Sequence, residues 1–300
     1  MTLNTIIRGC NTILLMPRIH RVLRHLIAAI AMLSMLTSCS LATIAYNNAD
    51  TLIGYALRDY VELNVEQEIW LKERITLLMA WHRSNELPQW QRWLTEARER
   101  AAGMPETSDL RATYVRGQAL LARTTAQALP DLAKLLHQLE PAQIAFLENK
   151  FANDNRKLAK DIAVALPTRY AKRADDVREG FEGWLGSLTP EQAAYLQARA
   201  TILVPMEEMR LADRRRWQRE LIELVKARPE LPTLEAELRS WILSPEKYRD
   251  PVYQAEMNRQ YEAMLGVTAW MVTNATPQQK LRVQKKLSGY AEDIARLLRN

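Results

Sequence analysis

The sequence predicts an all-α protein, a multi-helix bundle of antiparallel helical hairpins that divides into two lobes. Strong helix formers such as Ala, Leu, Glu, Gln and Arg abound, whereas the 300 residues include only nine Gly and three Phe. We find no segment of alternating apolar and polar residues and no Asn-Gly or Asp-Gly hairpin turn. One helix-start signature occurs four times in the chain. These three observations together favour helices throughout.

The four signatures each place a polar residue at the N-cap and Gln three positions later, and three of them place Pro at the first helical position. They are Asn64-Val65-Glu66-Gln67, Glu140-Pro141-Ala142-Gln143, Thr189-Pro190-Glu191-Gln192 and Thr276-Pro277-Gln278-Gln279. Asn48 or Asp50 is expected to cap an earlier helix, and Ser244-Pro245-Glu246 predicts a further helix start. The last helix is expected over residues 277–298.

Apolar residues between these starts recur every three to four positions, and prolines end, start or kink the segments. We therefore expect about ten to twelve helices with short connections. The signatures are unevenly spaced, so a solenoid of fixed period is not predicted. Gly183 and Gly186 cluster just before Leu188. We place the boundary there, with an N-terminal lobe over residues 49–187 and a C-terminal lobe over residues 188–300.

An export signal precedes this body. Arg18, Arg21 and Arg24 form a basic region, and an apolar run over residues 26–36 follows. Eleven positions are too few to span a membrane, which takes roughly 20 residues. Two other readings are an ordinary signal cut after Ala31 and a buried structural cysteine at Cys39. The first places the cut inside the apolar run, and the second does not explain why a cysteine follows such a run.

Leu36-Thr37-Ser38-Cys39 resembles the lipobox of bacterial lipoproteins at all four positions. The resemblance implies that residues 1–38 are a signal peptide starting at Met1 or Met16. Cys39 would carry a covalent diacylglycerol and an N-acyl chain, and residues 39–48 would form a lipidated tether. Ser40 stands where Asp would retain such a protein on the inner membrane, which implies an outer-membrane lipoprotein facing the periplasm. Three acyl chains hold a protein at a membrane essentially permanently.

The net charge of +6 belongs mostly to the leader. Four of the 41 basic residues and none of the 35 acidic residues lie in residues 1–38, which leaves +2 on the rest. We therefore expect no nucleic-acid partner. Cys39 is the only cysteine after the leader, so no disulfide is expected there.

The segment Trp81-His82-Arg83-Ser84-Asn85-Glu86-Leu87-Pro88 is the most suggestive polar cluster. His82 and Glu86 are four residues apart, and we expect them to pair near a helix C-terminus. Two ligands do not make a metal site, so neither a metal nor another cofactor is predicted. Enzyme signatures such as Gly-x-Ser-x-Gly or His-Glu-x-x-His are absent from the sequence, and no catalytic residue is assigned.

Tyr46-Asn47-Asn48-Ala49-Asp50, directly after the lipobox, and the 81–88 segment resemble an uncharacterised proteobacterial lipoprotein family. Asn155-Arg156-Lys157 and Leu188-Thr189-Pro190-Glu191-Gln192 fit the same family. The resemblance implies an envelope lipoprotein with a helical body and supplies no activity. The candidate binding surface comprises Tyr46, Asn47, Asn48, Asp50, Trp81, His82, Arg83 and Glu86.

The expected function is a non-enzymatic binding or scaffold protein of the cell envelope, anchored to the membrane by lipid and bound to another envelope protein or a cell-wall component. One alternative is a chaperone or foldase, because Leu188-Thr189-x-x-Gln192 is similar to the Leu-Thr-x-x-Gln motif of small helical periplasmic chaperones. Looser copies begin at Leu63, Leu139 and Ala275. A second alternative is a cell-wall-acting enzyme with carboxylates converging from separate helices.

Overall fold

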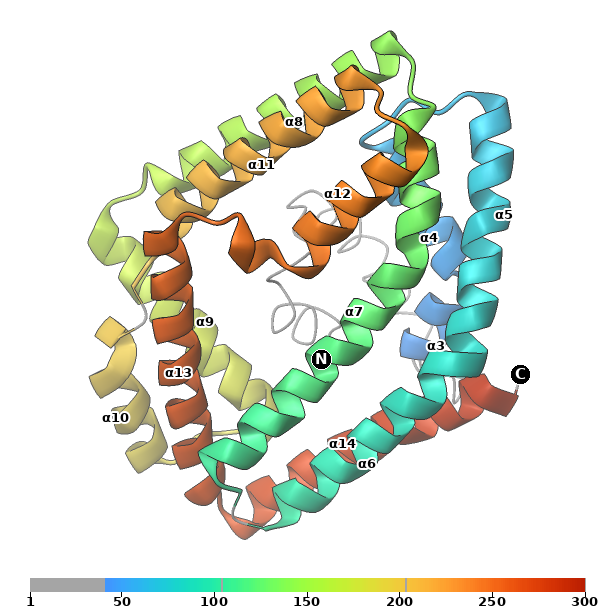
Figure 1. The fold of residues 1–300 in the computed structure, drawn as a ribbon. Helices are drawn as coiled ribbons and strands as arrows, with labels where there is room; N and C mark the ends of the chain where they lie inside the picture. Colours follow the sequence, from blue (N-terminus) through green and yellow to red (C-terminus); the bar gives the residue numbers. More distant parts are fainter. Residues whose placement is uncertain (1–40, 104, 203, 300) are drawn as a thin grey trace.

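A computed structural model describes residues 41–103, 105–202 and 204–299, and the helices it contains confirm the all-α prediction (Figure 1). The described part of the chain contains no strand. None of its helices is both long and apolar enough to cross a membrane. Cys39 and the leader lie outside the described residues.

The helices are α3 (Leu41–Asn47), α4 (Ala49–Arg58), α5 (Val65–Trp81), the π-helical turn η1 (His82–Glu86), α6 (Leu87–Ala102), α7 (Thr107–His137), α8 (Pro141–Ile162), α9 (Leu166–Leu185), α10 (Pro190–Arg199), the 3-10 turn η2 (Ala200–Ile202), α11 (Glu207–Ala227), α12 (Leu231–Leu243), the 3-10 turn η3 (Pro245–Lys247), α13 (Pro251–Thr273) and α14 (Pro277–Arg299).

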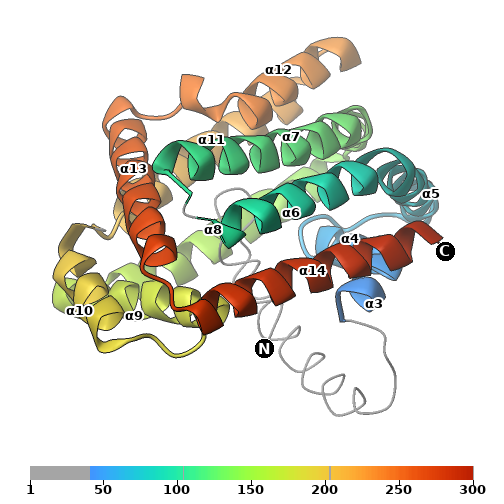
Figure 2. The same cartoon turned by 90° about the horizontal axis from the view of Figure 1, so that it is seen from below.

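The second half of the chain folds back along the first half. Helix α10 packs on α9, α11 on α8, α12 and α13 on α7, and α14 on α6. In Figure 1, α8 and α11 form one side of an irregular polygon and α6 and α14 form another, while α13 and α5 form the left and right sides and α7 runs diagonally between them. Figure 2 shows α14 running beside α6 toward α3. The closest helix pairs therefore cross the boundary predicted before Leu188, and that division stays a prediction.

Two of the predicted helix starts are joined to each other by their glutamines. Gln67 Nε2 donates to Gln143 Oε1 (3.2 Å), and Gln143 Nε2 donates back to Gln67 Oε1 (2.6 Å). Each Nε2 also donates to a backbone carbonyl before the partner helix, that of Gln138 or Glu62. We call this pair of glutamines the first clamp; it fixes the N-termini of α5 and α8 to each other.

The other two helix starts repeat this arrangement. Gln192 and Gln279 exchange two hydrogen bonds of 2.9 Å, and each Nε2 donates to a carbonyl before the partner helix, that of Asn274 or Ser187. This second clamp fixes α10 to α14. In both clamps the glutamine oxygen also accepts from the N–H of its own N-cap residue, which completes half of a capping box. The four signatures are therefore two matched pairs.

Each clamp lies beside a hydrophobic core. The larger core gathers α7, α8, α11 and α12 around Leu129, Leu139 and Leu234, each at most 1% exposed. A smaller one joins α9, α10 and α13 around Met271. The residues directly before the N-caps pack against these cores: Leu63, Leu139, Leu188 and Ala275. A hydrophobic residue at this position fixes the angle at which the chain enters the helix.

Two local predictions need correction. Residues 41–47 of the predicted tether form helix α3, which packs against α14. The helix start predicted at Ser244 is only the single 3-10 turn η3, because the Ser244 side chain makes no cap. Asp250 caps α13 instead, accepting from the N–H groups of Val252 (2.9 Å) and Tyr253 (3.1 Å).

Candidate functional site

The two sequence blocks proposed as a binding surface meet in the structure. Tyr46 Oη lies 2.9 Å from Nδ1 of His82, which is 36 positions later in the chain. Arg83 donates from Nη2 to Asn47 Oδ1 (3.0 Å), and its guanidinium lies 5.5 Å from the centre of the Tyr46 ring. Two neighbouring residues of α3, Tyr46 and Asn47, therefore each form a hydrogen bond with η1.

The π-helical turn explains how η1 presents these side chains. Leu87 N–H donates to the carbonyl of His82, five residues earlier, so α5 continues into α6 through one wider turn. Pro88 is the second residue of α6. In a regular α-helix its ring would crowd the carbonyl four residues earlier, and the wider turn relieves this conflict. Such single π turns are frequent at functional sites.

An open pocket of about 510 Å³ lies beside this contact. We call it the Tyr46 pocket. It mixes amide, hydroxyl, carboxylate and guanidinium groups with apolar side chains, and it is lined by Tyr46, Asn47, Asp50, Thr76, Met79, Ala80, Arg83, Ser84 and Leu298. Three separate parts of the chain build it: α3–α4, the α5–η1 segment, and the last turn of α14.

Burial keeps the Tyr46–His82 pair uncharged. It raises the pKa of Tyr46 above the ordinary 10.0, an effect that the Arg83 guanidinium opposes, and it lowers the pKa of His82 below the ordinary 6.5. Both groups are therefore neutral at pH 7. We assign Tyr46 as the donor to Nδ1, with the histidine proton on Nε2. The pair is a fixed neutral contact beside the charged Arg83.

The remaining predicted residues lie differently. Asn48 is exposed, and its side chain donates back to the carbonyl of Ile44 (2.8 Å). Trp81 is half-buried and does not line the Tyr46 pocket. Glu86 is fully buried and pairs with Arg123 on α7 at 2.9 Å, while its Oε2 has no hydrogen-bond partner among the described residues.

The predicted His82–Glu86 pair is therefore wrong. Their side chains have different partners, because Tyr46 binds the His82 ring and Arg123 binds the buried Glu86 carboxylate. His82 contacts α3 and Glu86 contacts α7 instead.

Sequence reasoning missed several residues that line the Tyr46 pocket. Thr76, Met79, Ala80 and Ser84 follow from the helical period once Arg83 is placed on the pocket side. Leu298 carries no such signal, since it lies more than 200 residues away and reaches the pocket only because α14 runs back along α6.

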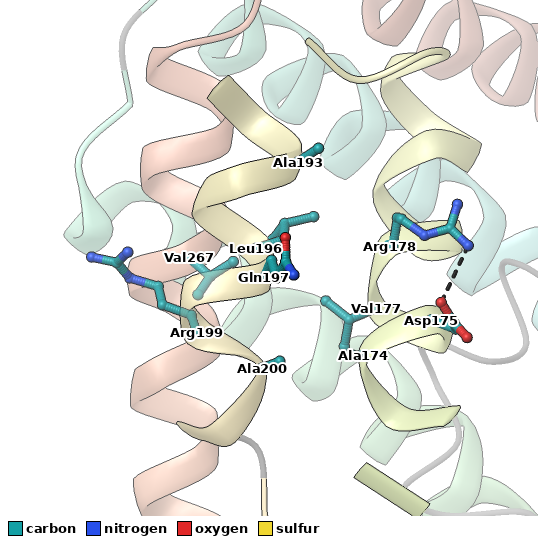
Figure 3. Close-up of a pocket in the computed structure, with 10 residues that line it drawn as sticks. All are labelled: Ala174, Asp175, Val177, Arg178, Ala193, Leu196, Gln197, Arg199, Ala200 and Val267. Carbon is teal, nitrogen blue, oxygen red and sulfur yellow. Dashed lines mark hydrogen bonds and ion pairs between the residues drawn. The ribbon is translucent and has the colours of Figure 1, made fainter. Parts of the chain in front are cut away.

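A second pocket, of about 330 Å³, lies between α9 and α10 (Figure 3). Val177 and Leu196 face each other across it, and Arg178 binds Asp175 at 3.3 Å. Arg199 points away from this pocket and lies over the Tyr195 ring at 3.7 Å. The lining is mostly small and apolar, with few groups that could orient a ligand.

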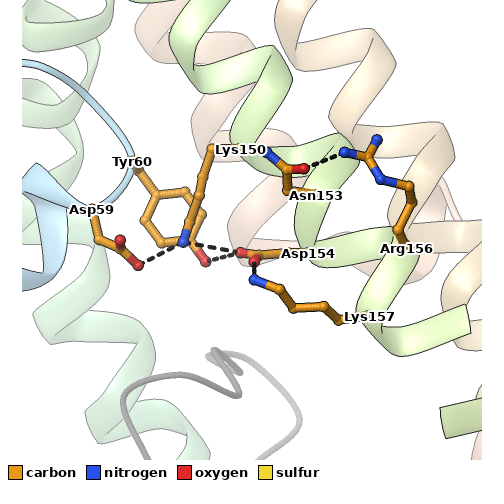
Figure 4. A network of polar contacts seen from close by, with 7 residues as sticks. All are labelled: Asp59, Tyr60, Lys150, Asn153, Asp154, Arg156 and Lys157. Atoms are coloured by element: carbon orange, nitrogen blue, oxygen red, sulfur yellow. Dashed lines mark hydrogen bonds and ion pairs between the residues drawn. The ribbon is translucent and has the colours of Figure 1, made fainter. Parts of the chain in front are cut away.

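A polar network joins α8 to the connection between α4 and α5 (Figure 4). Lys150 Nζ lies 2.6 Å from Asp59 and 3.5 Å from Asp154, whose Oδ2 accepts from the Tyr60 hydroxyl at 3.0 Å. Lys157 approaches Asp154 from the other side, at 3.4 Å. Burial and the Asp154 carboxylate raise the pKa of Tyr60. Because Asp154 is only 4% exposed and has three partners, the network is a structural support.

Metal and acid–base chemistry find little support among the described residues. Within them, no group of three or more His, Cys, Asp and Glu side chains is arranged to hold a metal ion. Each pocket contains a single carboxylate, Asp50 in one and Asp175 in the other. An acid–base pair of carboxylates therefore has no counterpart in either pocket.

Comparisons with known proteins give one match. A model for a family of unknown function, DUF6279, fits residues 59–254, a range that includes the 81–88 segment and begins after Tyr46 and Asp50. No curated protein matches the chain, and no solved structure matches it. Because the fitted range covers more than half of the sequence, this protein belongs to DUF6279, a family of unknown function.

Proposed function

We propose that this protein is an outer-membrane lipoprotein facing the periplasm, that Cys39 carries its acyl chains, and that its helical body is a non-enzymatic binding protein of the cell envelope. The observation that carries the binding role is the meeting of two sequence blocks at the Tyr46 pocket. Tyr46 and Asn47 reach His82 and Arg83 across 36 positions of sequence in each case. The neutral Tyr46–His82 pair and the charged Arg83 are held in place beside an open pocket, an arrangement typical of a ligand-binding site.

The chemistry of the Tyr46 pocket favours a polypeptide segment of another envelope protein. Asn47 and Ser84 offer both donors and acceptors for a backbone, and Arg83 offers a cation for a carboxylate or a carbonyl. Met79 and Leu298 add adaptable apolar surface for a side chain. The pocket is open, so an extended segment could enter without rearranging the fold.

Photo-crosslinking in intact cells tests this role. A photoreactive residue at Ser84, which is exposed and lines the Tyr46 pocket, should capture one envelope protein. The same residue at Glu191, exposed at the start of α10, should not capture it. Arg83→Ala should reduce the Ser84 adduct at least severalfold with the far-ultraviolet spectrum unchanged. Identical adducts from Ser84 and Glu191, or an adduct indifferent to Arg83→Ala, would refute the assignment of the pocket.

The anchor is tested separately. Intact mass should reveal three acyl chains on Cys39, and Cys39→Ser should move the protein from the membrane fraction to the soluble fraction. A Cys39→Ser protein that still sediments with membranes, or an unmodified Cys39, would overturn the placement.

A chaperone role is the second candidate, and the resemblance of one helix start to a chaperone motif favours it. Leu188-Thr189-x-x-Gln192 resembles a motif of helical periplasmic chaperones, and Gln192 pairs with Gln279 while the looser copies at Gln67 and Gln143 pair with each other. The body without its lipid should then slow aggregation of a denatured client. No effect at stoichiometric excess would count against this candidate.

A further inference from the structure

An uncharged stripe runs along the exposed side of α3 and α4. Its members are spaced at i, i+4, i+7, i+8 and i+11, the spacing of one helical face, and all are exposed: Ile44, Asn48, Thr51, Leu52 and Tyr55. The three large apolar members are 39%, 37% and 62% exposed in chain order. Charged residues come only at the end of the stripe, with Arg58 and Asp59.

The opposite side of the same two helices holds them to the body. Thr43 is buried, Tyr46 contacts His82, and Leu57 packs against the cluster that contains Leu71 and Ile75. The stripe therefore lies on the side of α3 and α4 that faces away from these contacts. Helices α3 and α4 are nearly continuous across the break at Asn48, whose N–H donates to Ile44 O and whose carbonyl accepts from Leu52.

The sequence distance to the anchor identifies what covers this stripe. Only Ser40 separates Cys39 from Leu41, the first residue of α3, and two steps along the chain reach at most about 7 Å. If Cys39 is acylated, α3 must begin at the lipid surface. From Ile44 to Tyr55 the stripe extends about 17 Å along the helix axis, at about 1.5 Å per residue. Helices that lie in a membrane interface bury an apolar face of this kind among the headgroups.

We propose that the stripe of Ile44, Leu52 and Tyr55 rests on the bilayer that holds the anchor, with α3 and α4 lying parallel to the membrane. This inference rests on the proposed acylation of Cys39. It also orients the body, because the Tyr46 pocket lies on the other side of α3 and thus opens away from the lipid toward the periplasm.

Fluorescence quenching in vesicles tests the proposal on the full acylated protein. Residues 39–300 have no cysteine besides Cys39, so one introduced cysteine can carry an environment-sensitive fluorophore. The test positions are Leu52→Cys and Tyr55→Cys. The controls are Ile53→Cys, 36% exposed on α4 but outside the stripe, and Val252→Cys, 70% exposed at the start of α13. Vesicles contain phospholipids with a nitroxide label near the headgroup.

Quenching at Leu52→Cys and Tyr55→Cys should exceed that at both controls by about twofold or more. Equal quenching at all four positions would overturn the proposal. A blue-shifted emission at Leu52→Cys without nitroxide quenching would also overturn it, since the stripe would then be covered by protein, such as a second copy. Intact mass of the same sample separates this from failure of the anchor: an acylated Cys39 with unquenched probes refutes only the orientation, whereas an unmodified Cys39 refutes the placement itself.

Discussion

The first clamp predicts a large and strongly coupled loss of stability when either glutamine is removed. Gln143 is 7% exposed and makes four hydrogen bonds: two donated to Gln67 and Glu62 and two accepted from Glu140 N–H and Gln67. At about 1 kcal/mol each, Gln143→Ala forfeits about 4 kcal/mol. The freed side-chain entropy returns about 1.5 kcal/mol. We expect a net loss of about 2.5 kcal/mol, with a similar value for Gln67→Ala.

The reciprocal bonds make these two losses overlap. Two of the four bonds join the glutamines to each other, so the double variant should lose about 2 kcal/mol less than the sum of the single losses. The measurement is urea unfolding of residues 39–300 carrying Cys39→Ser, followed by circular dichroism. Gln127, exposed on α7, provides the control, and Gln127→Ala should change stability by less than about 0.5 kcal/mol.

A cross-clamp pair sharpens the test. Gln143→Ala and Gln192→Ala remove one member of each clamp, and no contact joins these two side chains, so their losses should add within about 0.5 kcal/mol. The reasoning fails if Gln67→Ala and Gln143→Ala also add, because the hydrogen bonds between them would then contribute nothing. It fails equally if Gln143→Ala costs no more than Gln127→Ala.

Three further predictions follow from local features. Gly186 has φ +87°, so Gly186→Ala should lose about 1–3 kcal/mol in the same urea assay, whereas Gly180→Ala, in open space within α9, should be neutral or gain up to about 1 kcal/mol. Lys150→Met should lower the free energy of unfolding by about 3 kcal/mol, because the buried Asp154 carboxylate loses one of its cations. A loss smaller than that of the same substitution at an exposed lysine would refute the role of the network. Burial lowers the pKa of His82, so the unfolded chain binds this proton more readily; stability should be highest above pH 6.5 and fall as the pH drops toward the folded-state pKa. His82→Gln should flatten that dependence, and an NMR titration of His82 at or above 6.5 would contradict it.

Local rules predicted where helices begin, because a capping box is specified by residues three positions apart. They placed the starts at Asn64, Glu140, Thr189 and Thr276 correctly. They could not predict that the glutamines bind one another, since each pair is separated by more than 70 positions. Capping uses the side-chain oxygen of each glutamine. The pairing depends on the side-chain nitrogen, which takes no part in capping.

The errors have the same origin. The spacing of four positions suggested that His82 and Glu86 pair, but His82 contacts Tyr46 of α3 and Glu86 contacts Arg123 of α7. Ser244 is a residue type that often caps helices. Its side chain nevertheless makes no cap, and only a 3-10 turn follows it. Which side chain a polar residue contacts, and whether a cap forms, depends on packing, which sequence spacing does not contain.

Because the chain folds back on itself, the candidate site is built from both ends of the described chain. The Tyr46 pocket joins α3, at the beginning of the described chain, to Leu298 in the last turn of α14. Helix α14 reaches that place because it packs on α6 along its length and is fixed at its start by Gln279 of the second clamp. The pocket is thus complete only when both halves of the chain have folded. If the pocket binds a partner as proposed, it does so only after α14 has packed against α6.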